Sequence, residues 1–151
     1  ARAHIPDLNL SSDIIVGFPG ETDDEFQTSL DYVREIGFSR LHVFTYSQRP
    51  GTAAAKMPNQ IHGSVKKERA QRMISLGNEM SLAFHQQYEG QTMNVLWESS
   101  VGADSQGLRW VGYTDNYIRV HGHGSADLFN RVTRVVLANG RYDGMDGVIK
   151  K

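Results

Sequence analysis

The sequence predicts an α/β region followed by an all-β region. Between residues 13 and 46, two apolar runs flank a segment whose apolar residues recur at helical spacing, which is the pattern of a βαβ unit. From Gly90 onward short apolar runs alternate with glycine, and nine of the fifteen glycines lie there. Five short strands within residues 90–151 predict a small closed or partly open barrel, because closure hides the edges of so small a sheet.

The first apolar run, at residues 13–16, predicts a buried strand that ends in the turn Gly17-Phe18-Pro19-Gly20. Parallel α/β proteins bind ligands at this end of a strand. Gly17 and Gly20 would let the main chain approach a flat ligand, and Pro19 fixes its own φ. From spacing alone, a ligand site and a plain strand-to-helix connection are equally good interpretations.

The helix that follows has clear signals at both ends. Thr22 and Glu25 form the pattern of a capping box, and Gly37 is placed to end the helix in a left-handed conformation. A second strand at residues 38–46 should therefore run parallel to the first. The loop at residues 46–55 then lies at the same edge as the first turn. Arg49 in this loop could hold a carboxylate or phosphate, or could be a solvated turn residue.

A long helix is predicted from Ser64 to about Tyr88. Its expected buried residues are Met73, Leu76, Met80, Ala83 and Phe84. Its first turns are unusually basic, which marks either a phosphate-facing surface or a solvated face. These basic residues are Lys66, Lys67, Arg69 and Arg72.

The barrel strands are expected at residues 92–98, 108–111, 117–121, 131–137 and 147–150. A net charge of −1 excludes a globally basic nucleic-acid binder, but beyond Gly90 seven Lys and Arg stand against six Asp and Glu. A mildly basic barrel permits a nucleic-acid face made of basic and aromatic side chains. Candidates are Arg109, Trp110, Tyr113, Asn116, Tyr117, Arg119, His121 and Arg134, of which about half should be core or solvated surface. Strand alternation would place Tyr117, Arg119 and His121 on one face.

The residues indicate no catalytic group and no metal site of the chain's own. The chain has no cysteine, so it offers no thiol nucleophile and no thiolate for an iron–sulfur cluster. It has neither a P-loop nor an HExxH pair, and His121 and His123 lack a third ligand at suitable spacing. No apolar run is long enough to span a membrane and the start lacks a signal-peptide pattern, so no membrane partner and a cytoplasmic location are expected.

Three motifs in order resemble the carboxyl-terminal half of the radical-SAM methylthiotransferases. They occupy residues 13–22, 41–52 and 112–120. His42-Val43-Phe44 and the pair Asn116-Tyr117 are most similar to the branch that acts on threonylcarbamoyladenosine beside the tRNA anticodon. The isopentenyladenosine-tRNA and ribosomal-protein branches are alternatives.

The resemblance implies three parts. Residues 1–64 would be the last βα units of a radical-SAM partial TIM barrel, residues 65–89 a helical connection, and residues 90–151 an OB-like RNA-binding barrel called TRAM. In the family reaction, reductive cleavage of S-adenosylmethionine gives a 5′-deoxyadenosyl radical, and a methylthio group replaces a hydrogen of the adenine ring. Two 4Fe–4S clusters are required.

The resemblance also assigns residues. The S-adenosylmethionine pocket would be lined by Ile15, Val16, Gly17, Phe18, Pro19, Phe44, Thr45, Tyr46 and Arg49. The tRNA would be bound by Arg109, Asn116, Tyr117, Arg119, His121 and Arg134.

Lacking cluster cysteines, the chain alone is expected to be inactive, and residues 1–9 are expected to be the tail of an earlier element. Its two strands of an open barrel should promote self-association or instability. Competing interpretations are a non-catalytic RNA-binding module and, ranked last, a plain nucleotide-binding α/β domain.

Overall fold

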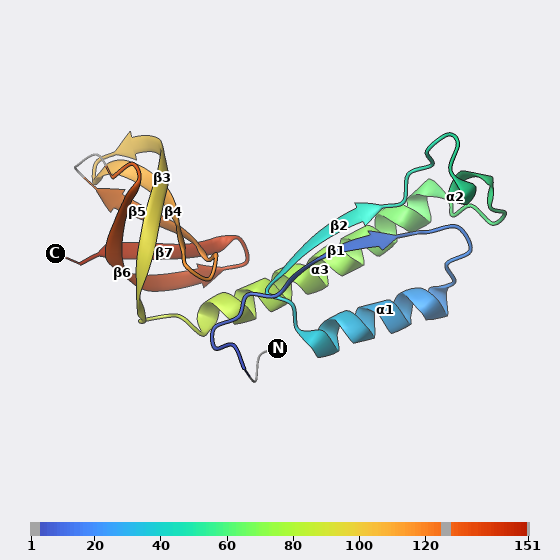
Figure 1. The fold of residues 1–151 in the computed structure, drawn as a ribbon, viewed down its shortest axis with the longest axis horizontal. Coiled ribbons are helices and arrows are strands. Elements are labelled where there is room, and N and C mark those ends of the chain that lie inside the picture. The colour runs from blue at the N-terminus through green and yellow to red at the C-terminus, as the bar shows by residue number, and fades with distance from the viewer. Residues whose placement is uncertain (1–3, 125–127, 151) are drawn as a thin grey trace. The chain divides into compact units, whose positions relative to one another are not determined.

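The computed structural model describes residues 4–124 and 128–150. The chain divides into two units (Figure 1). One comprises residues 10–80 and is called the α/β region below. The other comprises residues 1–9 and 81–151 and contains a β-barrel.

The α/β region contains the predicted βαβ unit. Strands β1 (Ser11–Val16) and β2 (Arg40–Thr45) pair in parallel, and helix α1 (Asp23–Ile36) connects them. The capping box is confirmed: Thr22 Oγ1 accepts a hydrogen bond from the Glu25 N–H, and the Glu25 carboxylate accepts one from the Thr22 N–H. Gly37 ends the helix with φ +66°. These local signals therefore suffice to define the unit.

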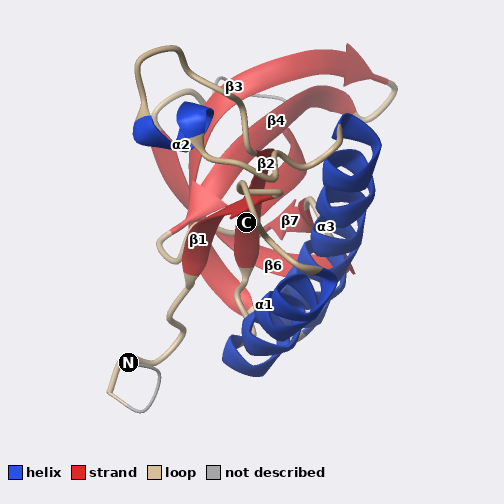
Figure 2. Cartoon of the chain, turned by 90° about the vertical axis from the view of Figure 1, so that its right-hand side faces the viewer, coloured by secondary structure: helices blue, strands red, loops and turns tan. Residues whose placement is uncertain are grey.

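One face of the β1–β2 sheet is covered and the other is open. Helices α1 and α3 (Gly63–Gln86) lie on the same side of it (Figure 2) and enclose one core. That core is formed by Val16, Phe26, Leu30, Val33, Met73 and Leu76. Ile15 and Phe44 stand opposite each other in register and are 60% and 54% exposed. The pair thus forms an apolar patch on the open face.

Helix α3 confirms Met73 and Leu76 as buried, whereas the expectation for Ala83 is wrong, because that residue is exposed. In the last turns the buried positions are Ser81 and His85, followed by Tyr88 beyond the helix. The buried stripe therefore continues from Met73 at helical spacing but passes through Ser81 and His85 and not through Ala83. A short helix, α2 (Ala53–Lys56), lies in the segment predicted to be a loop, and Thr52 caps it.

The barrel contains all five predicted strands, each longer than expected. They are β3 (Thr92–Asp104), β4 (Gly107–Thr114), β5 (Arg119–Gly124), β6 (Arg131–Arg141) and β7 (Gly144–Ile149). The sheet closes in the order β3-β4-β5-β7-β6, with β5 and β7 parallel and all other pairs antiparallel. Every barrel strand therefore has two neighbours.

Trp97 occupies the centre of the barrel and is fully buried. Its Nε1 donates a hydrogen bond of 2.8 Å to Thr133 Oγ1. A Cβ at Gly122 would lie 2.6 Å from the Trp97 ring, and a Cβ at Gly112 would overlap the neighbouring strand. These interior glycines therefore make room for one large aromatic side chain. In the described part of the chain, no helix combines the length and apolar character needed to cross a membrane.

Candidate functional site

The two predicted loops meet at the carboxyl ends of β1 and β2. The Tyr46 N–H donates a hydrogen bond of 2.8 Å to the Val16 carbonyl. The rings of Phe18 and Tyr46 pack edge to face, with centroids 5.2 Å apart. The structure thus brings residues 15–19 and 44–46 together, and we call this place the cofactor edge.

Gly17 is held by an acidic side chain that sequence reasoning assigned to no site. Its φ is +73°, and its N–H donates to Glu21 Oε2 at 2.8 Å. The same carboxylate accepts a hydrogen bond of 2.6 Å from Arg69. The second guanidinium nitrogen of Arg69 contacts Asp23 Oδ1 at 2.6 Å. The turn after β1 is therefore tied to the start of α3 by an ion-pair network.

Arg69 is only 4% exposed, so neither role predicted for it, a phosphate-facing or a solvated side chain, is correct. Burial alone would lower the pKa of Arg69, but hydrogen bonds to Asp23 and Glu21 raise it above its ordinary value. The signal was present in the sequence as an acidic first turn of α1 and basic first turns of α3. The sequence did not reveal that Arg69 pairs with Asp23, 46 residues earlier in the chain, and with Glu21, 48 residues earlier.

Lys66 contacts Tyr46 and lies beside Gly17 at this edge. Its Nζ donates to the Tyr46 carbonyl at 3.0 Å and lies 5.7 Å from the centre of the Tyr46 ring. A Cβ at position 17 would overlap the Lys66 side chain. The position of the Lys66 side chain therefore leaves room only for glycine at position 17. That the main chain at Gly17 approaches a ligand stays a prediction.

The residues predicted to line the cofactor pocket differ in accessibility. Ile15, Phe18 and Phe44 present exposed apolar surface. The side chains of Val16 and Pro19 are buried, whereas Thr45 and Arg49 are exposed. The Tyr46 hydroxyl is buried without a hydrogen-bond partner among the described residues. The edge can thus offer apolar faces to a flat ring.

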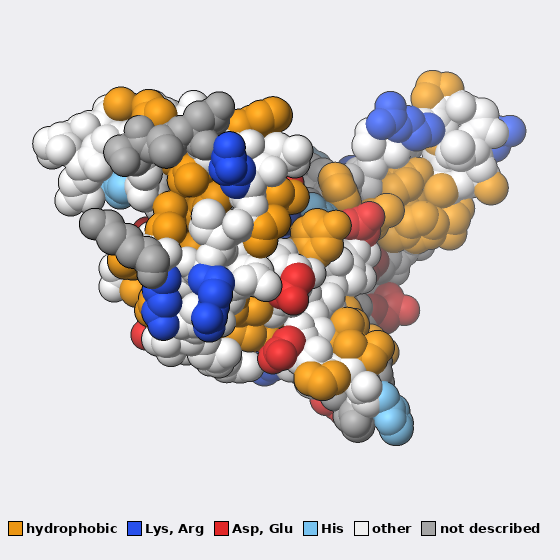
Figure 3. Space-filling view, turned by 60° about the vertical axis from the view of Figure 1, so that its left-hand side comes forward, with side chains coloured by type: hydrophobic (Ala, Val, Ile, Leu, Met, Phe, Trp, Pro, Cys, Tyr) orange, Lys and Arg blue, Asp and Glu red, His pale blue; other side chains and the backbone are white. Residues whose placement is uncertain are grey.

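The outer face of the barrel carries most of the predicted RNA-binding residues. Arg119 stands opposite Tyr113, His121 opposite Val111, and Arg109 opposite His123 on the paired strands β4 and β5. Arg134 lies on β6, opposite Asn94 of β3. Figure 3 shows basic side chains standing beside hydrophobic ones on the barrel face turned toward the viewer. Trp110 is 4% exposed and belongs to the core, so its candidacy was wrong.

Asn116 and Tyr117 lie in the turn between β4 and β5. The Asn116 amide oxygen accepts a hydrogen bond of 2.6 Å from Thr114 Oγ1, and its backbone carbonyl accepts one from Asn9. Tyr117 has φ +61° and precedes the strand, so the predicted alternation holds only from Ile118 onward. The turn leaves the Tyr117 ring exposed to solvent.

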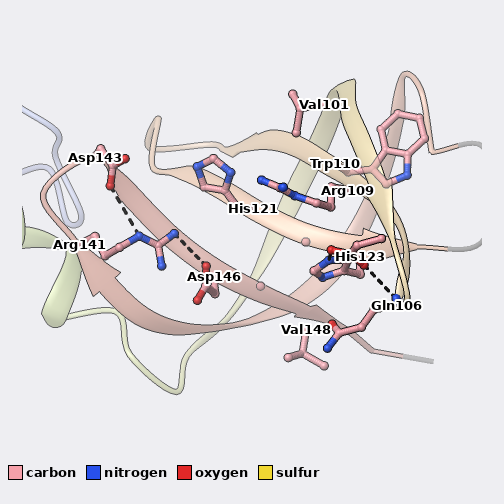
Figure 4. Close-up of a pocket in the computed structure, with 13 residues that line it drawn as sticks. Val101, Gln106, Arg109, Trp110, His121, His123, Arg141, Asp143, Asp146 and Val148 are labelled. Carbon is pink, nitrogen blue, oxygen red and sulfur yellow. Dashed lines mark hydrogen bonds and ion pairs between the residues drawn. The ribbon is translucent and has the colours of Figure 1, made fainter.

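A hollow of about 550 Å³ on the barrel collects charged side chains (Figure 4). Arg141 contacts Asp146 at 2.8 Å and Asp143 at 3.6 Å, and His123 contacts Asp104 at 2.9 Å. Arg109 extends toward His121 in Figure 4 and forms no ion pair with the described residues. Burial, Arg119 and Arg141 hold the pKa of His121 below its ordinary value. Of the cations that the structure describes in this hollow, Arg109 is the one left to meet an anion at neutral pH.

Within residues 4–124 and 128–150, no three His, Cys, Asp or Glu side chains gather as a metal site would require.

Comparison with known proteins finds relatives that the chain matches over part of their length. No model of a protein family matches the chain. The chain is 38% identical over 143 residues to a threonylcarbamoyladenosine tRNA methylthiotransferase of Bacillus subtilis. The aligned residues make up 95% of the chain and 32% of that protein. The chain is a homologue of the methylthiotransferases and matches their C-terminal part.

Other methylthiotransferases are similar to a comparable degree. A tRNA-2-methylthio-dimethylallyladenosine synthase of Pelotomaculum thermopropionicum is 40% identical over 149 residues, which is 98% of the chain and 33% of that protein. A ribosomal-protein methylthiotransferase of Desulforamulus reducens is 48% identical over 97 residues, which is 64% of the chain and 22% of that protein. The chain spans about a third of the length of the relatives that it matches along most of its length. These identities do not separate the substrates that the names describe.

Proposed function

We propose that this chain is part of an enzyme that adds a methylthio group to threonylcarbamoyladenosine beside the anticodon of tRNA. The observation that carries the proposal is the match to the Bacillus subtilis relative over 95% of the chain. The similarity of His42-Val43-Phe44 and Asn116-Tyr117 to this branch supports the choice of substrate. Dimethylallyladenosine in tRNA is the second candidate, because relatives named for it are 36–40% identical over 97–98% of the chain.

In this proposal residues 1–64 are the last βα units of a radical-SAM barrel, residues 65–89 a connection, and residues 90–151 a TRAM barrel. The cofactor edge would form one wall of the S-adenosylmethionine pocket. Ile15, Phe18 and Phe44 fit this role, since their exposed apolar surface suits an adenine ring. Arg49 would face the cofactor carboxylate or the RNA. S-adenosylmethionine would supply the radical chemistry when bound.

The residues of this chain do not fit the iron–sulfur clusters of the family. Cluster irons are held by cysteine thiolates, and the chain contains none. Both clusters would therefore be held outside this chain, and the chain alone would not catalyse the reaction.

The barrel is proposed to bind the tRNA in the cytoplasm. Arg109, Arg119 and Arg134 form no ion pairs with the described residues and lie on the outer face. Unpaired cations can replace the counterions of phosphates, which is the main source of affinity for RNA. The open face of the β1–β2 sheet would favour self-association of the isolated chain.

The proposal is tested by deleting the gene that encodes the chain and measuring modified nucleosides of total tRNA by mass spectrometry. We expect the methylthio form of threonylcarbamoyladenosine to disappear while that of dimethylallyladenosine stays unchanged. The reverse result would assign the second candidate. If both persist, the tRNA assignment is wrong, and a non-catalytic RNA-binding role or the ribosomal-protein branch replaces it.

A further inference from the structure

A second hollow on the barrel, of about 280 Å³, differs from the charged one in its lining. This is slightly below the size at which pockets for drug-like ligands begin, about 300 Å³. It lies over strands β3, β4 and β6 and the turn that follows β4. Its size suits one ring system of a ligand.

The floor of the hollow is apolar, and the strand register determines it. Leu96 stands opposite Val132 on β6 and opposite Tyr113 on β4. Residues directly opposite in antiparallel strands have Cβ atoms about 5 Å apart, so these three side chains form one continuous row. Val132 is 63% exposed. The row therefore presents apolar surface that the described residues do not cover.

One wall of the hollow is Tyr117, whose side chain is 76% exposed. Its backbone is fixed, because the Tyr117 N–H donates to the Thr114 carbonyl at 3.0 Å and the Ile118 N–H donates to Thr114 Oγ1 at 2.9 Å. A left-handed conformation is uncommon for an aromatic residue. A structured turn thus holds an aromatic ring in solvent beside an apolar floor, which is the arrangement on which bases stack.

The charged side chains in and beside this hollow limit the kinds of ligand that it can bind. Glu98 and Asp115 line the hollow, and among the described residues no Lys, Arg or His does. Carboxylates repel a phosphate but accept hydrogen bonds from an amino group. Unpaired cations flank the row instead: Arg119 stands opposite Tyr113, and Arg134 opposite Asn94.

We infer that this hollow binds one unpaired nucleobase that carries an exocyclic amino group. The ring lies against Tyr117 and the apolar floor, the amino group donates to Glu98 or Asp115, and the adjoining phosphates contact Arg119 and Arg134. The inference rests on the proposed RNA binding and adds to it a position and a preference among bases.

Hexacytidylate and hexauridylate test this preference, because cytosine carries an amino group where uracil carries a carbonyl. Fluorescence anisotropy with the whole chain should give about tenfold tighter binding of hexacytidylate, since hydrogen bonds to charged groups reach that size. The double variant Glu98→Gln, Asp115→Asn should abolish the difference between the two oligomers. The amide introduced at position 115 would keep a side-chain oxygen to accept from the Asn116 N–H, so the turn is retained.

Removing the aromatic wall tests the stacking. Tyr117→Asn should weaken hexacytidylate binding about tenfold, because asparagine tolerates the left-handed backbone but has no ring. Tyr117→Phe should bind within about twofold of the unmodified chain, since the ring remains. Tyr142→Asn is the matched control, because Tyr142 is also exposed on the barrel but lines neither hollow described here.

The outcomes separate the inference from the proposed function. If tRNA binds but cytidine is not preferred, or Tyr117→Asn has no effect, the inference is wrong and the proposed function stands. If tRNA and both oligomers fail to bind, both are wrong.

Discussion

The two regions of this chain differ in how their strands are paired and how their sheets are covered. Each barrel strand pairs with two others, and the sheet closes around Trp97. Strands β1 and β2 pair only with each other among the described residues, and one face of their sheet carries exposed Ile15 and Phe44. Closure makes the barrel complete by itself, whereas the α/β region relies on two helices and the Arg69 network. The difference teaches that closure leaves the barrel without an open sheet edge, while the α/β region keeps an edge and an uncovered face.

Trp97→Ala should have the largest effect on stability. It empties the centre of the barrel and leaves Thr133 without its donor, so the barrel should lose about 3–5 kcal/mol of unfolding free energy. Urea denaturation followed by tryptophan fluorescence and circular dichroism measures this loss. Val101→Ala, at an exposed position of the same strand, should cost less than about 0.5 kcal/mol. Equal effects of the two variants would refute a core centred on Trp97.

Arg69→Ala should disrupt the α/β region and spare the barrel. Removing one partner of a buried ion pair costs about 3 kcal/mol, here at the lower end because Asp23 is exposed. Hydrogen exchange should therefore increase in α1 and the turn at Gly17, but not in β3–β7. Arg34→Ala breaks an exposed pair with Asp31 and should change exchange in neither region. Increased exchange throughout the barrel would show that the two regions do not respond separately.

Thr22→Ala should cost about 1 kcal/mol, the usual value of a lost N-cap. The hydrogen bonds from Thr22 hold the pKa of Glu25 below its ordinary value. A carboxyl whose pKa is lowered by folding stabilises the fold above its unfolded pKa, and the effect is lost as pH falls through its folded pKa. The difference between Thr22→Ala and the unmodified chain should therefore shrink in acid, as thermal unfolding from pH 7 to pH 3 would show. A difference that grows in acid would contradict the capping box.

His85 should give the smallest effect, a pH dependence of barrel stability. Burial lowers the pKa of His85, and its Nδ1 lies against the Arg141 carbonyl, to which a neutral ring can donate. The unfolded chain then binds the proton more readily, so stability falls as pH drops below about 6.5. His85→Gln should flatten this dependence in part, because the pKa of His121 is lowered too. An unchanged pH profile in His85→Gln would exclude this role.

Much of the fold followed from local signals. The capping box at Thr22, the C-cap at Gly37 and the glycine-separated runs beyond Gly90 each depend on residues close together in the chain. The cap of α2 had the same kind of signal in Thr52 and was overlooked. Strand β3 was underestimated because its second half, at residues 99–104, is exposed on both faces and lacks apolar alternation.

The candidate sites could be predicted less completely from the sequence, because they depend on contacts between residues far apart in the chain. The sequence placed the two loops of the cofactor edge together through the rule for parallel strands. It could not reveal that Arg69 reaches Glu21, or that Lys66 fills the space beside Gly17. On the barrel, the basic residues were identified by type, but the register that aligns Val132, Leu96, Tyr113 and Arg119 is a property of the closed sheet.

The affinity of the chain for tRNA over a salt series tests the central claim, that the barrel binds RNA through its outer face. We expect the logarithm of the association constant to fall linearly with the logarithm of salt concentration. The triple variant Arg109→Gln, Arg119→Gln, Arg134→Gln should weaken binding and reduce this slope by about two, as the loss of three phosphate contacts predicts. The double variant Arg34→Gln, Arg40→Gln in the α/β region is the control and should bind like the unmodified chain. Unchanged affinity and slope in the triple variant would contradict the claim.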